Sequence, residues 1–153
     1  FAVDVSGIGE TVRQKESPTW KEYFGSEWPN YFAAYMLDKT YVGMRAQDIL
    51  SCVQYLRNNH PASKIHLVAI GETGIPALHV AALEPQLFET VTLKNSLLSW
   101  SDVLHHTITK NQLINTVHGA LQYYDLPDLA NSIPSEKLRI ENPVNALGEA
   151  VSK

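Results

Sequence analysis

The residues best suited to chemistry follow a short apolar segment in the middle of the chain. The segment 65–70 is apolar except for His66, and Gly71, Glu72, Thr73 and Gly74 come directly after it. A buried strand that turns sharply into a helix presents a nucleophile at the carboxyl edge of a sheet, where the helix N-terminus helps to stabilise an oxyanion. We therefore expect a strand–turn–helix here, with acyl transfer as the chemistry to examine.

The residue at the tip of this turn has no reactive side chain. A nucleophile elbow needs small residues two positions before and after the nucleophile, because the strained turn brings their backbones together. This spacing puts Ala69 at the first small position and Gly71 at the nucleophile. Neither Glu72 nor Thr73 has small residues on both sides at that spacing, and a β-branched threonine fits a strained turn poorly.

Two acidic residues are the remaining candidates for proton transfer. Glu72 stands at a predicted helix N-terminus, where the helix dipole favours a carboxylate. We expect it to cap the helix, with acid–base chemistry or cation binding as the alternative. Asp102 follows Ser96, Ser99 and Ser101 after a predicted strand, and it is the best surviving acid.

The other reactive side chains are predicted to be structural. His105 and His106 are adjacent, so on a helix they point about 100° apart, which is poor geometry for one metal ion. We expect His66 and His79 to pack and form hydrogen bonds, and Cys52 to be an inert thiol among apolar helix positions. The sequence therefore predicts neither a metal site nor a cofactor.

Two further patterns also favour structural interpretations. Gly7 and Gly9 begin a dinucleotide-type spacing, but Val12 occupies the position of its third glycine, so a turn is expected. Aromatic residues gather before the first long helix, and packing is favoured over a carbohydrate platform. These residues are Trp20, Trp28, Tyr31, Phe32 and Tyr35.

The elements that must position these groups alternate along the chain. Strands are predicted over 1–5, 65–70, 91–93 and 138–141, and helices over 31–37, 44–58 and 75–83, with one or two more in 102–124. A loop with one helical turn near 20–24 fills 10–30, and Pro127 and Pro134 are expected to break the chain. Alternating strands and helices predict a single α/β domain with a mainly parallel sheet.

The helix predicted over 44–58 is amphipathic. Its apolar stripe repeats at helical spacing, whereas Arg45 and Asp48 are assigned to the polar side. The stripe consists of Ala46, Ile49, Leu50, Val53 and Leu56.

Length and charge exclude several classes of protein. The 153 residues fit one domain over 1–153, and one cysteine allows no internal disulfide. With 12 basic and 16 acidic residues the formal charge is -4, which argues against nucleic-acid binding. We expect no membrane span and see no signal peptide, and the compartment stays undetermined. Because the chain opens at Phe1 inside a predicted strand, we expect it to be a fragment of a longer protein.

Several segments in the right order resemble one family. Residues 65–85 resemble the nucleophile elbow and following helix of α/β-hydrolases, and 4–11 resembles a D-x-R-G-x-G-E-T loop one helix earlier. Residues 42–49 resemble the start of that helix, and 124–129 and 142–148 resemble the approach to the catalytic acid. Together they resemble the acetyl xylan esterase-like branch of the α/β-hydrolase superfamily.

The resemblance implies a three-layer α/β sandwich with a partial α/β-hydrolase, Rossmann-like core, ester hydrolysis and an acylated carbohydrate ligand. It also implies that the Ser–Asp–His triad is incomplete. Gly71 stands at the serine, Asn145 stands at the acid, and no histidine follows His118. We therefore predict a domain without triad hydrolysis. The alternatives are an ester hydrolase with a non-standard nucleophile and a non-catalytic module that associates with itself.

The family topology also predicts an incomplete sheet. In that topology, the strand matching 1–5 is not adjacent to the strand matching 65–70, and the strand between them comes earlier in the family's chain. An unfilled sheet edge exposes unpaired backbone groups. We therefore expect association with another copy of the chain or with segments absent from it.

Overall fold

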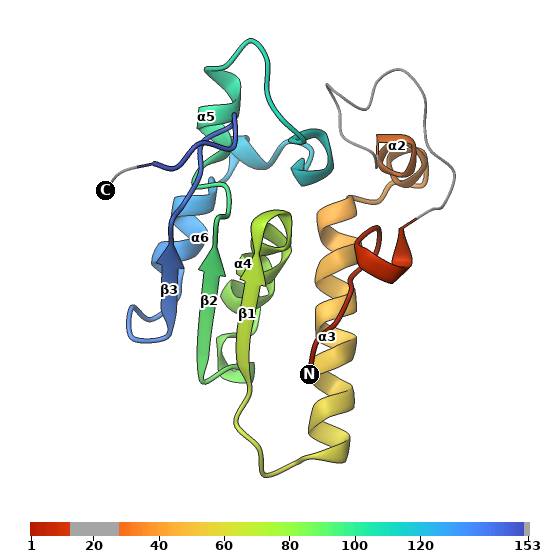
Figure 1. Ribbon diagram of the computed structural model, residues 1–153, viewed down its shortest axis with the longest axis vertical. Helices are drawn as coiled ribbons and strands as arrows, with labels where there is room; N and C mark the ends of the chain where they lie inside the picture. Colours follow the sequence, from red (N-terminus) through yellow and green to blue (C-terminus); the bar gives the residue numbers. More distant parts are fainter. Residues whose placement is uncertain (13–27, 152–153) are drawn as a thin grey trace.

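The computed structural model describes residues 1–12 and 28–151 (Figure 1). The helices are α2 (Trp28–Met36), α3 (Tyr41–Asn59), α4 (Gly74–Leu83), α5 (Trp100–Leu104) and α6 (Leu126–Ser132), and the strands are β1 (His66–Ile70), β2 (Thr90–Lys94) and β3 (Leu138–Glu141). Short 3-10 turns are η1 (Gly9–Thr11), η2 (Gly71–Thr73), η3 (Pro85–Leu87), η4 (Leu113–Asn115) and η5 (Ala120–Gln122).

The three strands form one parallel sheet in the order β1-β2-β3. β2 is the central strand, with Leu67 opposite Val91 on one side and Val91 opposite Leu138 on the other. Parallel strands joined through helices confirm the predicted α/β class and the mainly parallel sheet.

Helices cover one face of this sheet. Leu67 and Ala69 of β1 pack into the main core with α3 and α4, whereas His66, Val68 and Ile70 point to the exposed face. α4 contacts β1, β2, α3 and α6, so it lies at the centre of the helical layer (Figure 1). The described residues thus form two layers, and the three-layer sandwich stays a prediction.

The N-terminal residues do not form the predicted strand. The segment 1–5 lies along α3 beyond the β1 edge (Figure 1), and no strand is present in it. Phe1 stacks on Tyr55 of α3 with ring centroids 6.1 Å apart, and Val5 is buried in the core. The prediction of a strand was wrong because an extended apolar segment becomes a strand only when a neighbouring edge pairs with it.

Two predictions for the C-terminal half also need correction. Residues 102–124 hold only the end of α5 and the turns η4 and η5, because left-handed backbone at Asn111 and Gly119 interrupts any longer helix. Pro127 does not break the chain but lies in the first turn of α6, where its missing N–H costs little.

The remaining elements agree with the sequence within a few residues. The helix predicted over 44–58 begins earlier, at Tyr41, because the Thr40 hydroxyl accepts a hydrogen bond from the Gly43 N–H at 3.0 Å. The helical turn predicted near 20–24 and Trp20 lie outside the described residues. Within the described ranges, each helix is too short or too polar to cross a membrane.

Candidate functional site

The turn after β1 has the shape that the sequence predicts. β1 runs into η2 and then into α4, and Gly71 lies at the tip with φ 63°, in the left-handed region. A Cβ placed on Gly71 meets no heavy atom within 4 Å. The turn therefore holds its tip residue in a conformation that favours glycine and leaves open space where a side chain would project.

Small residues flank the turn on both sides. Ala69 is buried, and a Cβ on Gly74 would lie 1.9 Å from the Ser96 Oγ and 2.6 Å from the Ser96 Cβ. Ser96 is itself buried just after β2. The first turn of α4 thus approaches the end of β2 so closely that only glycine fits at position 74.

The Thr73 hydroxyl is committed to the turn. Its Oγ1 donates to the Ile70 carbonyl and accepts from the Ile70 N–H, both at 2.9 Å. A threonine that closes its own turn in this way is held in place by the backbone. The geometry gives Thr73 a local structural role.

Glu72 forms an ion pair with a buried arginine of α3. The Glu72 Oε2 lies 2.8 Å from the Arg45 Nη1, with the Arg45 side chain 1% exposed and the Glu72 side chain 41% exposed. The Arg45 Nε donates to the Ser6 carbonyl at 2.9 Å, and its guanidinium lies 4.9 Å from the centre of the Tyr41 ring. Glu72 is therefore a structural anion, and its carboxylate compensates a buried positive charge.

The assignment of Arg45 to the polar side of its helix was wrong. Arg45 lies three residues after Val42 and four before Ile49, which places it within the buried stripe. That spacing is the signal in the sequence that could have identified Arg45 as buried.

Asp48, one turn further along α3, is half-buried and accepts hydrogen bonds from the Ser6 N–H at 2.9 Å and the Ser6 hydroxyl at 2.7 Å. These contacts fix the loop after Val5 against α3.

Asp102 lies where the loops after β2 and β3 meet. Its Oδ2 accepts from the Ala146 N–H at 2.7 Å, and its Oδ1 lies 3.7 Å from the His106 Nδ1. The His106 Nδ1 hydrogen-bonds the Asp102 backbone carbonyl at 2.8 Å, and one nitrogen cannot serve both oxygens well. The side chain of Asp102 therefore anchors the 145–146 loop.

Asn145 organises its own loop. Its Oδ1 accepts from the N–H groups of Leu147 and Glu149, and its Nδ2 donates to the Glu149 Oε2 at 3.1 Å. The bonds to the Oδ1 are those of an Asx turn. Asn145 and Asp102 are brought to neighbouring positions, whereas no hydrogen bond or ion pair in the described part of the chain joins either of them to residues 71–74.

His79 and His66 form hydrogen bonds within the fold. The His79 Nδ1 donates to the Ile75 carbonyl at 2.8 Å, so its Nε2 accepts from the Tyr124 hydroxyl at 3.1 Å. Burial lowers the pKa of His79, against the opposing effect of the Ile75 carbonyl. The ring is therefore neutral at pH 7, and both of its nitrogens form hydrogen bonds within the fold. His66 contacts the Thr90 hydroxyl, as a cross-strand pair.

Two further kinds of group could carry chemistry, a set of metal ligands and the Cys52 thiol. Among residues 1–12 and 28–151, no three His, Cys, Asp or Glu side chains are grouped so that they could hold a metal ion. Burial, with a smaller contribution from Asp48, raises the pKa of the Cys52 thiol. A raised pKa keeps the thiol protonated and weakly nucleophilic.

Asp125 is a structural hub that sequence reasoning missed. Its carboxylate accepts from the Ser99 hydroxyl at 2.6 Å, from the N–H groups of Trp100 and Ser101, and from the Leu126 N–H at 2.6 Å. Burial alone would raise the pKa of Asp125, but these hydrogen bonds outweigh it and lower the pKa to about 2. One carboxylate thus caps both α5 and α6 and holds the Ser99 hydroxyl in a hydrogen bond.

We expect Asp125→Ala to lower the free energy of unfolding by about 2 kcal/mol, the upper end for a lost helix cap. Because folding lowers this pKa, its contribution is present above the ordinary carboxyl pKa and is lost as pH falls from about 4 towards about 2. Urea unfolding at pH 7 and pH 3 checks both points, with exposed Glu136→Ala as the matched control. An equal loss at both pH values would contradict the pH dependence.

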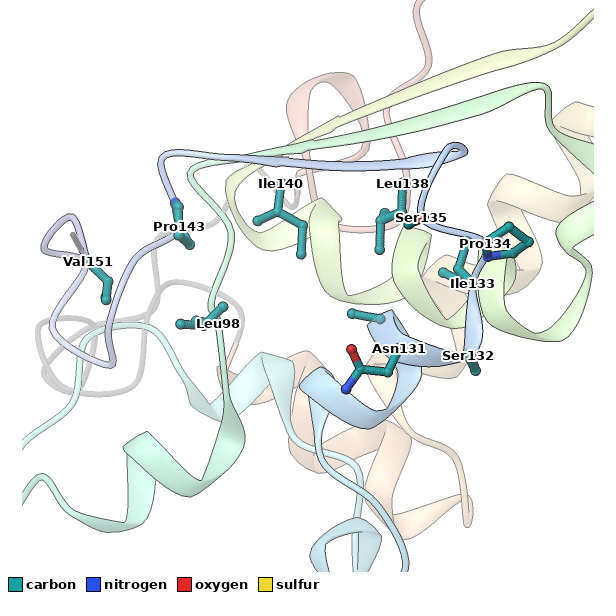
Figure 2. Close-up of a pocket in the computed structure, with 11 residues that line it drawn as sticks. Leu98, Asn131, Ser132, Ile133, Pro134, Ser135, Leu138, Ile140, Pro143 and Val151 are labelled. Carbon is teal, nitrogen blue, oxygen red and sulfur yellow. The ribbon is translucent and has the colours of Figure 1, made fainter. Parts of the chain in front are cut away.

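A groove of about 710 Å³ lies between α6 and β3, at the edge of the sheet opposite to β1 and its turn. Figure 2 shows Leu138 and Ile140 of β3 facing Asn131 of α6 across it, with Leu98 and Pro143 at one end. Every side chain lining the groove is apolar or an uncharged amide or hydroxyl. The groove is a largely apolar surface, and none of its lining side chains titrates near neutral pH.

Comparison with known proteins does not identify a family for this chain. No protein-family model, no curated protein and no solved structure matches this chain. The resemblance to esterases therefore stays a prediction.

Proposed function

We propose that this chain is an acetyl-esterase-like α/β-hydrolase domain that carries the framework of the catalytic turn without its chemistry. It acts as a non-catalytic module. The observation that carries the proposal is Gly71, which occupies the left-handed tip of a strand–turn–helix with open space above it. The backbone of the turn has the shape that would present a nucleophile, but the glycine at its tip has no side chain that could act as one.

The neighbouring groups support the same proposal. Triad hydrolysis needs a hydroxyl in hydrogen-bond contact with a histidine that a carboxylate orients. Within the described residues, Thr73 bonds only to the Ile70 backbone and Glu72 to Arg45, and Asn145 bonds within its own loop. Each of these three candidate side chains thus has contacts that stabilise the local structure.

The sheet fits a partial core of the larger fold. The three parallel strands and the helices on one face account for two layers, and the other face carries exposed Val68 and Ile70. Parallel sheets are usually covered on both faces. In this proposal the exposed face is the side on which a third layer of a complete α/β-hydrolase domain lies.

Hydrolysis of an activated aryl acetate tests the proposal. We expect the purified chain to release the phenol at the rate of buffer alone, because no activated nucleophile is present. Turnover that is proportional to protein concentration would overturn the proposal.

The Gly71→Ser variant extends the test. We expect it to fold, at a cost of about 1–2 kcal/mol for a left-handed non-glycine residue, because a side chain there meets no neighbour. It should remain inactive, because serine alone lacks a base to activate it. Circular dichroism checks folding, and sustained turnover by this variant would show that a functional base is already in place.

A further inference from the structure

The outer edge of β3 carries backbone groups that no described residue uses. On the inner side of β3, the Val91 N–H of β2 donates to the Lys137 carbonyl at 2.8 Å. Because the direction of the backbone groups alternates along a strand, the N–H and C=O groups of Leu138 and Ile140 point away from β2. Within the described ranges these groups have no hydrogen-bond partner, and Figure 1 shows no helix or strand beyond this edge.

The groove between α6 and β3 lies directly beside this edge. The side chains of Leu138 and Ile140 form one wall of it, and Asn131 of α6 faces them (Figure 2). Side chains alternate between the two faces of a sheet, so every second residue of a strand added at this edge would also point toward α6. The lining is uncharged, and a charge placed there would lose its hydration without gaining a partner. The surface therefore suits a strand whose alternate side chains are apolar.

The chain itself shows which kind of segment pairs on this side of the sheet. Just after β3, Val144 lies between Leu97, in a parallel bridge, and Ala150, in an antiparallel bridge. The Val151 N–H donates to the Pro143 carbonyl at 2.8 Å, and Val151 lines one end of the groove. An antiparallel strand thus already begins on the outer side of the sheet, and the described residues leave the edge of β3 itself unpaired.

We propose that the β3 edge binds an extended peptide of a partner protein, antiparallel to β3 and in line with Ala150 and Val151, with alternate apolar side chains in the groove. Addition of a strand to an open edge is a general mode of peptide recognition, in which main-chain hydrogen bonds give affinity and pockets for alternate side chains give specificity. A helix or a lipid chain could fill the groove, but neither could pair with the outward backbone groups of Leu138 and Ile140. The combination of edge and groove therefore favours a strand.

Selection from a library of random peptides displayed on phage tests this proposal, with the purified chain immobilised. We expect the enriched peptides to have apolar residues at alternate positions, and fluorescence anisotropy gives the Kd of each synthetic peptide. Methylation of the backbone nitrogens that face β3 should weaken binding by about tenfold or more, whereas methylation of the alternate nitrogens should not. Equal effects of the two methylated forms would overturn the proposal, because the peptide would then bind through its side chains alone.

A charge in the groove supplies a test from the side of the protein. Asn131 is exposed on α6, so Asn131→Lys should keep the fold, which circular dichroism checks, and should weaken peptide binding by about tenfold. The matched control is Gln122→Lys, which replaces another exposed amide outside the groove and should leave the Kd unchanged.

Hydrogen exchange measured by NMR locates the binding edge. The amides of Leu138 and Ile140 should exchange rapidly in the free chain and slowly in the complex, whereas the Arg139 amide, which faces β2, should be slow in both. A library that yields no binding peptide would overturn the proposal. So would a peptide that leaves the Leu138 and Ile140 amides unprotected, or one whose binding Asn131→Lys does not change. None of these outcomes depends on whether the chain hydrolyses esters.

Discussion

Replacing Glu72 with leucine is expected to lower the free energy of unfolding by about 2 kcal/mol, less than for a fully buried ion pair because the Glu72 side chain is 41% exposed. The cause lies in its partner, because the Arg45 side chain is 1% exposed and cannot turn to water when the carboxylate is removed. One guanidinium nitrogen, Nη2, is already buried without a hydrogen-bond partner, so little compensation is left. Urea unfolding measures the effect.

A second substitution separates the ion pair from simple packing. The double variant Glu72→Leu with Arg45→Met removes the buried charge together with its partner, and apolar replacement of a whole buried pair is often close to neutral. We therefore expect the double variant to be more stable than Glu72→Leu alone. A double variant that is no more stable than Glu72→Leu would mean that the unpaired charge of Arg45 does not cause the loss of stability. The structural role of the ion pair would then be refuted.

The chain contains a matched control for this experiment. Lys64 and Glu89 form an ion pair at 2.7 Å, almost the same distance as the Arg45–Glu72 pair, but both of its side chains are well exposed. Exposed pairs contribute little because water screens them. Glu89→Leu should therefore leave the urea midpoint nearly unchanged, and a large shift would mean that burial is not what distinguishes the two pairs.

Gly74→Ala is expected to cost about 3 kcal/mol, the upper part of the range for overpacking, because the new methyl group would overlap the Ser96 side chain. Gly71→Ala supplies the comparison, because its Cβ enters open space and bears only the strain of a left-handed backbone. We expect the order of stability to be parent, then Gly71→Ala, then Gly74→Ala. Thermal unfolding of the three proteins checks this order.

Removing the obstructing side chain should rescue the Gly74 variant. Both atoms that a Cβ at position 74 would overlap belong to the Ser96 side chain, and the nearest backbone atom is 3.8 Å away. Gly74→Ala combined with Ser96→Gly is therefore expected to recover most of the lost stability. A double variant no more stable than Gly74→Ala alone would mean that the backbone, and not Ser96, sets the approach of α4 to β2.

The sequence predicts the regular centre of the fold because local pattern and tertiary environment agree there. The strand at 65–70, the turn at Gly71 and the following helix each have periodicity and turn residues that match their final state. Left-handed Gly71 is the clearest case, since glycine is the residue that adopts this backbone at least cost.

Predictions failed where a partner far along the chain decides the outcome. Arg45 carries a polar side chain on a helix, and only the folded chain brings Glu72 and the Ser6 carbonyl within reach of it. Asp125 also caps α5, through hydrogen bonds from Ser99 and Trp100, which lie more than twenty residues earlier in the chain. No local motif encodes these long-range bonds. The segment 1–5 has strand-like composition, but pairing is a property of two segments and cannot be assigned from one.

The central claim is that neither the turn after β1 nor the serines after β2 provide an activated nucleophile, and intact-mass spectrometry after reaction with excess fluorophosphonate tests it most directly. These probes form a covalent bond only with a nucleophile that a neighbouring base activates. We predict that the mass of the folded chain is unchanged. A stoichiometric adduct that peptide mapping places on Thr73, Ser96, Ser99 or Ser101 would contradict the claim and identify the nucleophile of an active esterase.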